Sequence, residues 1–121
     1  MSTMTTIIPI LGAQYLANPR DVAASLTEAE KEARTIALLT KVQTMGGMVM
    51  LIPEPSNRHN PNAVLARHRG VSVGYVGDDY LEVVHRALKQ NGGRPLLAAI
   101  TEVKVYKHGY LYVALPNVVA A

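Results

Sequence analysis

The chain has 121 residues, of which 49% are hydrophobic and 17% are charged, and this balance excludes an intrinsically disordered protein. It contains no cysteine, which excludes a disulfide framework, a cysteine-ligated zinc site and a thiol nucleophile. The formal net charge is +3, and 8 of the 12 Lys and Arg residues lie within residues 56–121, so an anionic partner is one interpretation of the charge.

Length and apolar patterning predict one domain that spans residues 1–121. The longest apolar runs are about ten residues, whereas a membrane-spanning helix needs about twenty. The N-terminus has no basic region of the kind that begins a signal peptide. We therefore expect a cytoplasmic protein with no membrane partner.

The first third of the chain is predicted to contain a strand and a long helix. Residues 6–16 form the strand, which Pro9 restricts to an edge or an irregular position. Residues 17–24 form a turn. Residues 25–47 form the helix, because Ser25 or Thr27 can begin it with a capping box and Gly46-Gly47 ends it.

The remaining elements are predominantly strands. Residues 48–53 predict a strand buried on both faces, and strands at 62–68 and 71–76 follow the polar stretch EPSNRHNPNAV at 54–64. A second helix at 77–93 is capped by Asp78 or Asp79 and carries one apolar face. A hairpin at 94–116 ends the pattern. The order β–α–β–β–β–α–β–β predicts a mainly β fold with two helices (α+β), a small OB-like, partly open β-barrel of about six strands.

Enzymatic chemistry finds little support in the sequence. The four histidines include no pair at helical i,i+4 spacing, and Asp78-Asp79, the one carboxylate pair outside the first helix, is explained by helix capping. No serine lies in a nucleophile elbow, and no phosphate-binding glycine loop is present. We expect a protein that is not an enzyme and that uses no metal or cofactor.

The aromatic residues favour nucleic-acid binding, because exposed rings stack on bases while basic side chains contact phosphates. All six aromatic residues are tyrosines, and five of them lie within residues 75–112 together with the excess of Lys and Arg. Strand alternation places Tyr110 and Tyr112 on one face. The alternative is that these rings cover a half-buried sheet edge.

The segment 48–76 resembles the HIRAN domain. The matching positions, which occur in order and at compatible spacing, are Glu54-Pro55, Asn57, Asn62-Ala63-Val64 and Gly74-Tyr75-Val76. The resemblance covers residues 48–115 well and the N-terminus weakly. It leaves residues 19–45 as a helical insertion within a single HIRAN-like domain.

The resemblance implies an OB-like barrel that binds single-stranded DNA or captures DNA 3′ ends and acts in DNA repair, replication, recombination or phage–host biology. It also implies a pocket for the terminal nucleotide, formed by Asn57, His59 at the family's aromatic position, Asn60 at its aspartate position, Tyr75 and Tyr110. An asparagine has no charge to repel a 3′-phosphate, so selection of a free 3′-hydroxyl becomes an open question. Candidate phosphate contacts are Arg58, Arg67, Arg69, Lys104 and Lys107.

A protein-interaction module that uses the same fold is the alternative function. The long helix at 27–45 and the methionines Met45, Met48 and Met50 favour it, since methionine suits adaptable interfaces. The expected partners are therefore single-stranded DNA or a second protein.

Overall fold

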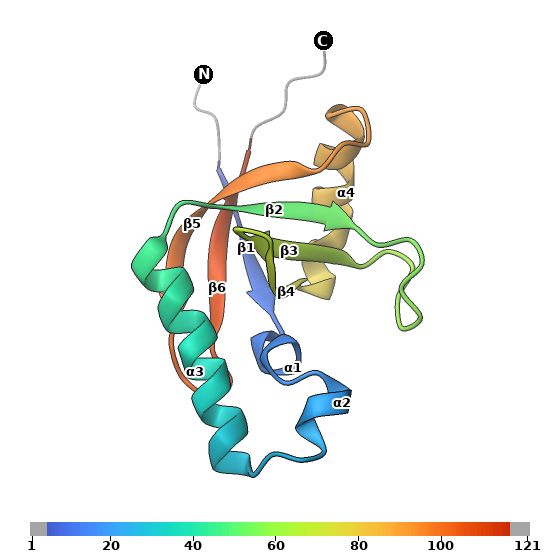
Figure 1. Cartoon of the computed structure of the whole chain (residues 1–121). Coiled ribbons are helices and arrows are strands. Elements are labelled where there is room, and N and C mark those ends of the chain that lie inside the picture. Colours follow the sequence, from blue (N-terminus) through green and yellow to red (C-terminus); the bar gives the residue numbers. More distant parts are fainter. Residues whose placement is uncertain (1–4, 117–121) are drawn as a thin grey trace.

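Six strands form a closed barrel (Figure 1). The apolar side chains that alternate along these strands fill its interior. The computed structural model describes residues 5–116. The strands are β1 (Thr6–Leu11), β2 (Met48–Pro53), β3 (Val64–His68), β4 (Val71–Val76), β5 (Leu96–Lys104) and β6 (Tyr110–Leu115). Their order is β1-β4-β3-β2-β5-β6, and every pairing is antiparallel.

The mainly β, OB-like fold expected from the sequence is confirmed, but the barrel is closed where a partly open one was expected. Strand β1 pairs with β6 from Thr6↔Leu115 to Ile10↔Leu111, which closes the ring. Pro9 lies inside this pairing rather than on a free edge. Its carbonyl, which proline retains, accepts a hydrogen bond of 3.1 Å from the Gly77 amide.

The core is built from the inward face of each strand, from one side of α4 (Leu81–Gln90) and from Leu39 and Val42 of the long helix α3 (Glu28–Met45). The expected apolar face of this helix is confirmed, because Leu81, Val84 and Leu88 are buried. The expected caps are wrong. Asp78 and Asp79 belong to a short 3-10 helix, η1 (Asp78–Tyr80), which precedes α4, and neither helix has a side-chain cap.

Strand β2 has one buried face, not the two that were expected. Val49 and Leu51 are fully buried, whereas Met48 and Met50 are 47% and 40% exposed. The reason is the barrel itself, because a closed barrel has one interior and alternate residues of each strand must point away from it.

Three helices connect β1 to β2: α1 (Ala13–Ala17), α2 (Arg20–Ala23) and α3 (Glu28–Met45) (Figure 1). The expected first strand continues to residue 16, but β1 ends at Leu11, because Gly12 takes a left-handed conformation with φ +84° and turns the chain into α1. The expected turn at 17–24 contains α2. The helical segment thus begins at Ala13 instead of about residue 19.

The long helix α3 begins with a capping box at Thr27, which is one of the two expected cap residues. The Glu30 amide donates to Thr27 Oγ1 at 3.1 Å, and the Thr27 amide donates to Glu30 Oε1 at 2.9 Å. The other candidate, Ser25, donates its hydroxyl to the Val22 carbonyl instead. Gly46 ends the helix, as expected.

A buried polar cluster fixes α1 against α3. Asn18 Nδ2 donates to the Gln14 carbonyl at 3.0 Å, to the Lys31 carbonyl at 3.1 Å and to Thr35 Oγ1 at 3.2 Å. Arg34 Nε donates to Asn18 Oδ1 at 3.2 Å. Asn18 and Thr35 are both buried, so these bonds replace water that the side chains have lost and orient the α1–α2 segment.

The turn before β6 requires a residue without a side chain. A Cβ on Gly109 would overlap the Lys104 carbonyl and lie 2.5 Å from Leu39 Cδ1. We expect Gly109→Ala to lower the free energy of unfolding by about 3 kcal/mol, because core overpacking forces neighbouring backbone to move. Gly70→Ala is the comparison, because a Cβ added at Gly70 would meet open space. Only the left-handed φ of +82° then lowers the free energy of unfolding, by about 1 kcal/mol. Urea unfolding midpoints measure both, and equal midpoints would contradict the prediction.

Candidate nucleic-acid interface

The loop between β2 and β3 is organised by the side chain of Asn57. Its Oδ1 accepts hydrogen bonds from the His59 amide at 2.9 Å and the Asn60 amide at 3.1 Å. Its Nδ2 donates to Glu54 Oε1 at 3.1 Å. Asparagine forms such turns because its side chain resembles a peptide group. Asn57 therefore holds His59 and Asn60 in place.

Asn60 also stabilises the loop, because its Oδ1 accepts from the Asn62 amide at 2.9 Å. The side chains that stabilise the loop are thus those of Asn57 and Asn60. Asn62 contributes its carbonyl, which lies 2.7 Å from Nε2 of His85 on α4. This contact joins the loop to α4.

Tyr75 on β4 is oriented by a carboxylate at the start of the loop. Its hydroxyl donates to Glu54 Oε1 at 2.8 Å, the same oxygen that Asn57 contacts. Burial raises the pKa of Tyr75, and the hydrogen bond to Glu54 raises it further, so the phenol is protonated at neutral pH. Glu54 was expected only as part of the motif. Its support of Tyr75 depends on a contact across 21 residues of sequence.

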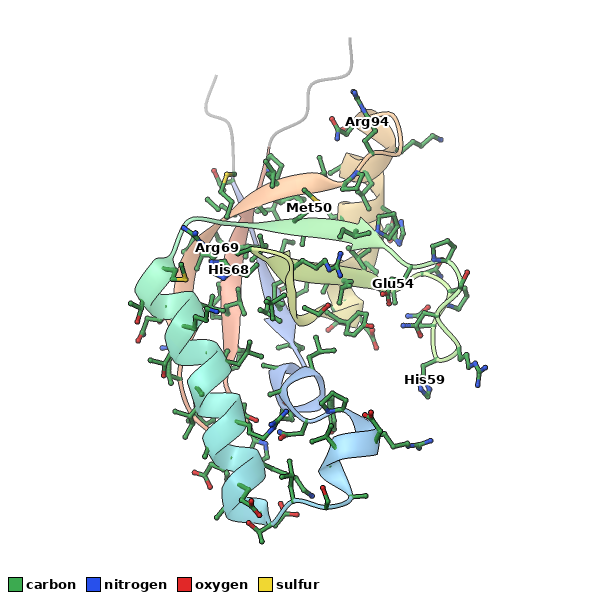
Figure 2. All side chains as sticks on the ribbon, viewed as in Figure 1. Met50, Glu54, His59, His68, Arg69 and Arg94 are labelled. Carbon is green, nitrogen blue, oxygen red and sulfur yellow. The ribbon has the colours of Figure 1, made fainter. Side chains whose placement is uncertain are left out.

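A cavity of about 630 Å³ lies between this loop, the α1–α2 segment and the start of α4. It gathers four of the predicted site residues, Asn57, His59, Asn60 and Tyr75. Figure 2 shows His59 at the tip of the loop. The cavity is also lined by residues that sequence reasoning missed: Gly12, Tyr15, Asn18, Arg20, Ala23, Ala63, Val76, Asp78 and Leu81.

Tyr110 does not line this cavity. Tyr75 on β4 pairs with Leu11 on β1. The preceding residue of β1, Ile10, pairs with Leu111 on β6, on the other side of the strand. Strand β1 therefore separates Tyr75 from Tyr110. Tyr110 instead packs edge-to-face with Tyr112 at a ring-centroid distance of 5.4 Å and with Tyr106 at 6.4 Å. The expectation that Tyr110 and Tyr112 share one face is confirmed. The expectation that Tyr110 lies in the pocket is wrong, because it belongs to a second aromatic surface, formed by Tyr106, Tyr110 and Tyr112.

The predicted phosphate contacts are spread over several surfaces. Arg58 is exposed in the loop, Arg67 is exposed on β3, and Arg69 borders a cavity of about 210 Å³ against α3. Lys107 lines a further cavity of about 400 Å³ beside α1 and α3. The structure thus brings none of these four into the cavity of about 630 Å³.

Lys104, the fifth predicted phosphate contact, is paired with an acid. Its Nζ lies 2.7 Å from Glu102 Oε1, and this interaction raises the pKa of Lys104. Lys104 faces Tyr110 across the β5–β6 pairing, so it belongs to the second aromatic surface. Its charge is partly compensated before any phosphate arrives.

Within residues 5–116, no group of three His, Asp or Glu side chains is placed to hold a metal ion. In the same part of the chain, no helix combines the length and the apolar character needed to cross a membrane.

Comparisons of the chain with protein-family models, with curated proteins and with solved structures found no match. The structure defines the class by itself: a closed six-stranded antiparallel barrel with helices between its first two strands and a cavity beside the β2–β3 loop. Membership of the HIRAN family stays a prediction from the loop motif.

Proposed function

We propose that this chain is a non-catalytic domain that binds single-stranded DNA and takes the terminal nucleotide of a strand into the cavity beside the β2–β3 loop. The observation that carries this proposal is the convergence of Asn57, His59, Asn60 and Tyr75 on one cavity. A role in DNA repair, replication or phage–host biology is part of the proposal and rests on the resemblance to the HIRAN domain.

The volume and the lining of the cavity support a nucleotide as ligand. Its volume of about 630 Å³ falls within the range of pockets that hold small organic ligands. The rings of His59 and Tyr75 supply flat faces of the kind on which bases stack. The loop that carries His59 is held by hydrogen bonds of its own, so little conformational entropy is lost when a ligand binds.

The distribution of charge supports binding of a strand end rather than of a long strand. The predicted cations do not form one groove, and Lys104 is already paired with Glu102. A strand that enters the cavity therefore has few cations within reach of its phosphates, chiefly Arg20 in the cavity wall and Arg58 in the loop.

Salt dependence tests the proposal. We expect the logarithm of the association constant to fall with the logarithm of salt concentration with a slope of about −1.4, since each of the two expected phosphate contacts on a single strand, Arg20 and Arg58, contributes about −0.7. Fluorescence anisotropy of a labelled DNA oligonucleotide between about 50 and 200 mM salt measures this slope. Absence of binding at the lower salt concentration would refute the proposal.

An exposed apolar surface favours a second candidate function, a protein-interaction module. Met50 on β2 and Leu97 on β5 are register partners, and with Met48 they are all at least 40% exposed on the outside of the barrel. Clustered exposed apolar side chains are typical of protein-binding surfaces. If this surface carries the function, the double substitution Met50→Ser and Leu97→Ser abolishes binding to the partner protein. Tyr75→Ala leaves that binding intact.

A further inference from the structure

A smaller hollow, here called the hairpin pocket, lies between α3 and the turn that joins β3 to β4. Its volume is about 210 Å³, and none of its lining residues lines the cavity of about 630 Å³. Five of its eight lining residues are apolar, namely Leu38, Val42, Met45, Val71 and Val73, and the other three are Lys41, His68 and Arg69. The hairpin pocket thus combines an apolar lining with positive charge.

The apolar rim of the hairpin pocket is left in contact with water. Met45 at the end of α3 is 42% exposed and Val71 at the start of β4 is 45% exposed, whereas Val42 and Val73 beneath them are buried. A ligand that covers this rim gains free energy, because it removes apolar surface from water. The volume lies below that of pockets that hold whole organic ligands, so it suits a single apolar side chain.

The charge of the hairpin pocket has one sign. Lys41 on α3 and Arg69 in the turn are both exposed, and no lining residue is acidic. Within residues 5–116, neither of these cations takes part in the three ion pairs of the structure. The complementary ligand therefore carries negative charge, and the Arg69 guanidinium is suited to donate two parallel hydrogen bonds to a carboxylate.

Arg69 occupies a backbone position that suits other residue types better. It is the one non-glycine residue with a positive φ among residues 5–116, +51°, and with Gly70 at +82° it forms the turn between the paired residues His68 and Val71. Turns of this kind favour asparagine, aspartate or glycine, because a longer L side chain is strained there. Strained backbone is typical of ligand-binding sites, where the side chain has a use apart from folding.

The two walls of the hairpin pocket are already joined. His68 is buried, and its Nε2 donates to the Gly46 carbonyl at 2.8 Å, which ties the end of β3 to the end of α3. Figure 2 shows His68 and Arg69 beside this end of α3. A pocket whose walls are fixed before binding costs less entropy to fill.

We infer that the hairpin pocket binds an acidic segment of another protein, which places one apolar side chain in the pocket and a neighbouring carboxylate on Arg69 and Lys41. This inference goes beyond the proposed function and does not depend on it. A peptide fits better than a nucleic-acid strand, because no tyrosine lines the pocket to stack on a base. The exposed residues Met50 and Leu97 do not line it either, so the site is separate from that surface.

The test uses the full chain and a short fluorescein-labelled peptide in which a leucine is flanked by aspartates and glutamates. We expect binding by fluorescence anisotropy, and a loss of about tenfold or more when the acids become amides or the leucine becomes serine. In ¹⁵N-labelled protein, the peptide shifts the amide signals of Met45, Arg69 and Val71 and leaves that of Asn57 unchanged. Absence of binding, or equal binding of the amide peptide, would overturn the inference.

Arg69→Asn separates the role of the side chain from that of the turn. We expect peptide binding to weaken about tenfold while the urea midpoint rises, because asparagine takes the left-handed conformation more readily than arginine. Lys41→Gln, on the exposed face of α3, weakens binding about fivefold. Arg67→Gln is the matched control, since Arg67 is an exposed cation of the same hairpin that does not line the pocket, and it leaves binding unchanged.

The same variants distinguish a peptide from DNA. If Arg69→Asn leaves peptide affinity unchanged, or weakens only the binding of an oligonucleotide, the inference is wrong and Arg69 is at most a phosphate contact. The proposed function is judged separately, by whether the wild type binds the oligonucleotide and Asn57→Ala weakens that binding.

Discussion

Replacement of Asn57 by alanine is expected to weaken binding of a single-stranded oligonucleotide by tenfold or more. The side chain makes three hydrogen bonds, to the amides of His59 and Asn60 and to the Glu54 carboxylate. Without them the loop samples many conformations, and binding must supply the ordering entropy of several residues at roughly 1 kcal/mol or more each. The effect is large because one side chain organises the whole loop.

Asn62→Ala is the matched control. It removes the same amide group from the same loop, but the contacts of Asn62 to Asn60 and His85 are made by its backbone. We expect affinity within about twofold of wild type for this variant, since a surface side chain without such contacts has a small effect. Anisotropy titrations compare the two variants. Equal losses for both, or none for Asn57→Ala, would contradict the assignment of Asn57 as the organiser of the loop.

The second large effect concerns the chemistry of the strand end. We expect the wild type to prefer a free 3′-hydroxyl over a 3′-phosphate by about tenfold, and Asp78→Asn to remove the preference, because a carboxylate accepts a hydrogen bond from a hydroxyl and repels a phosphate. Asp78 lines the cavity and caps neither η1 nor α4. Asn60, the position at which the resemblance places an aspartate, already uses its Oδ1 for the Asn62 amide.

Asp79→Asn controls for the change in net charge. Asp79 neighbours Asp78 in η1 and is also exposed, but it does not line the cavity. Competition between oligonucleotides with 3′-hydroxyl and 3′-phosphate ends, measured for wild type and both variants, gives the preference directly. A preference that survives in Asp78→Asn, or that is lost equally in Asp79→Asn, would show that Asp78 does not read the strand end.

Some of the candidate site was accessible from the sequence because its determinants are local. The hydrogen bonds of the Asn57 side chain that organise the loop reach residues no more than three positions away, and the turn-forming tendency of asparagine and proline can be recognised in the sequence over such distances. The motif around the loop also placed Tyr75 beside it correctly. The assignment of ligand-binding roles to Asn57 and Asn60 was less accurate, because the side-chain oxygens of both residues accept hydrogen bonds from amides of the loop itself.

The opposite wall of the cavity could not be predicted in this way. Tyr15 was placed in a strand, and its position in the wall depends on the turn at Gly12 and on the contacts of Asn18 with Lys31 and Thr35. Tyr110 was assigned to the same pocket as Tyr75 because the resemblance to the HIRAN domain implied it. The register of β1 with its two neighbours separates them.

Sequence alone predicted the presence and order of the six strands, the end of α3 at Gly46 and the polar loop, since apolar periodicity and turn-forming residues act over a few positions. Tertiary structure decided that the barrel closes, that Met48 and Met50 face outward, and that Tyr15, Arg20 and Asp78 share a cavity with the loop. These outcomes depend on pairings between residues far apart in the chain. Such pairings are set by how the strands and helices pack, which no local pattern encodes.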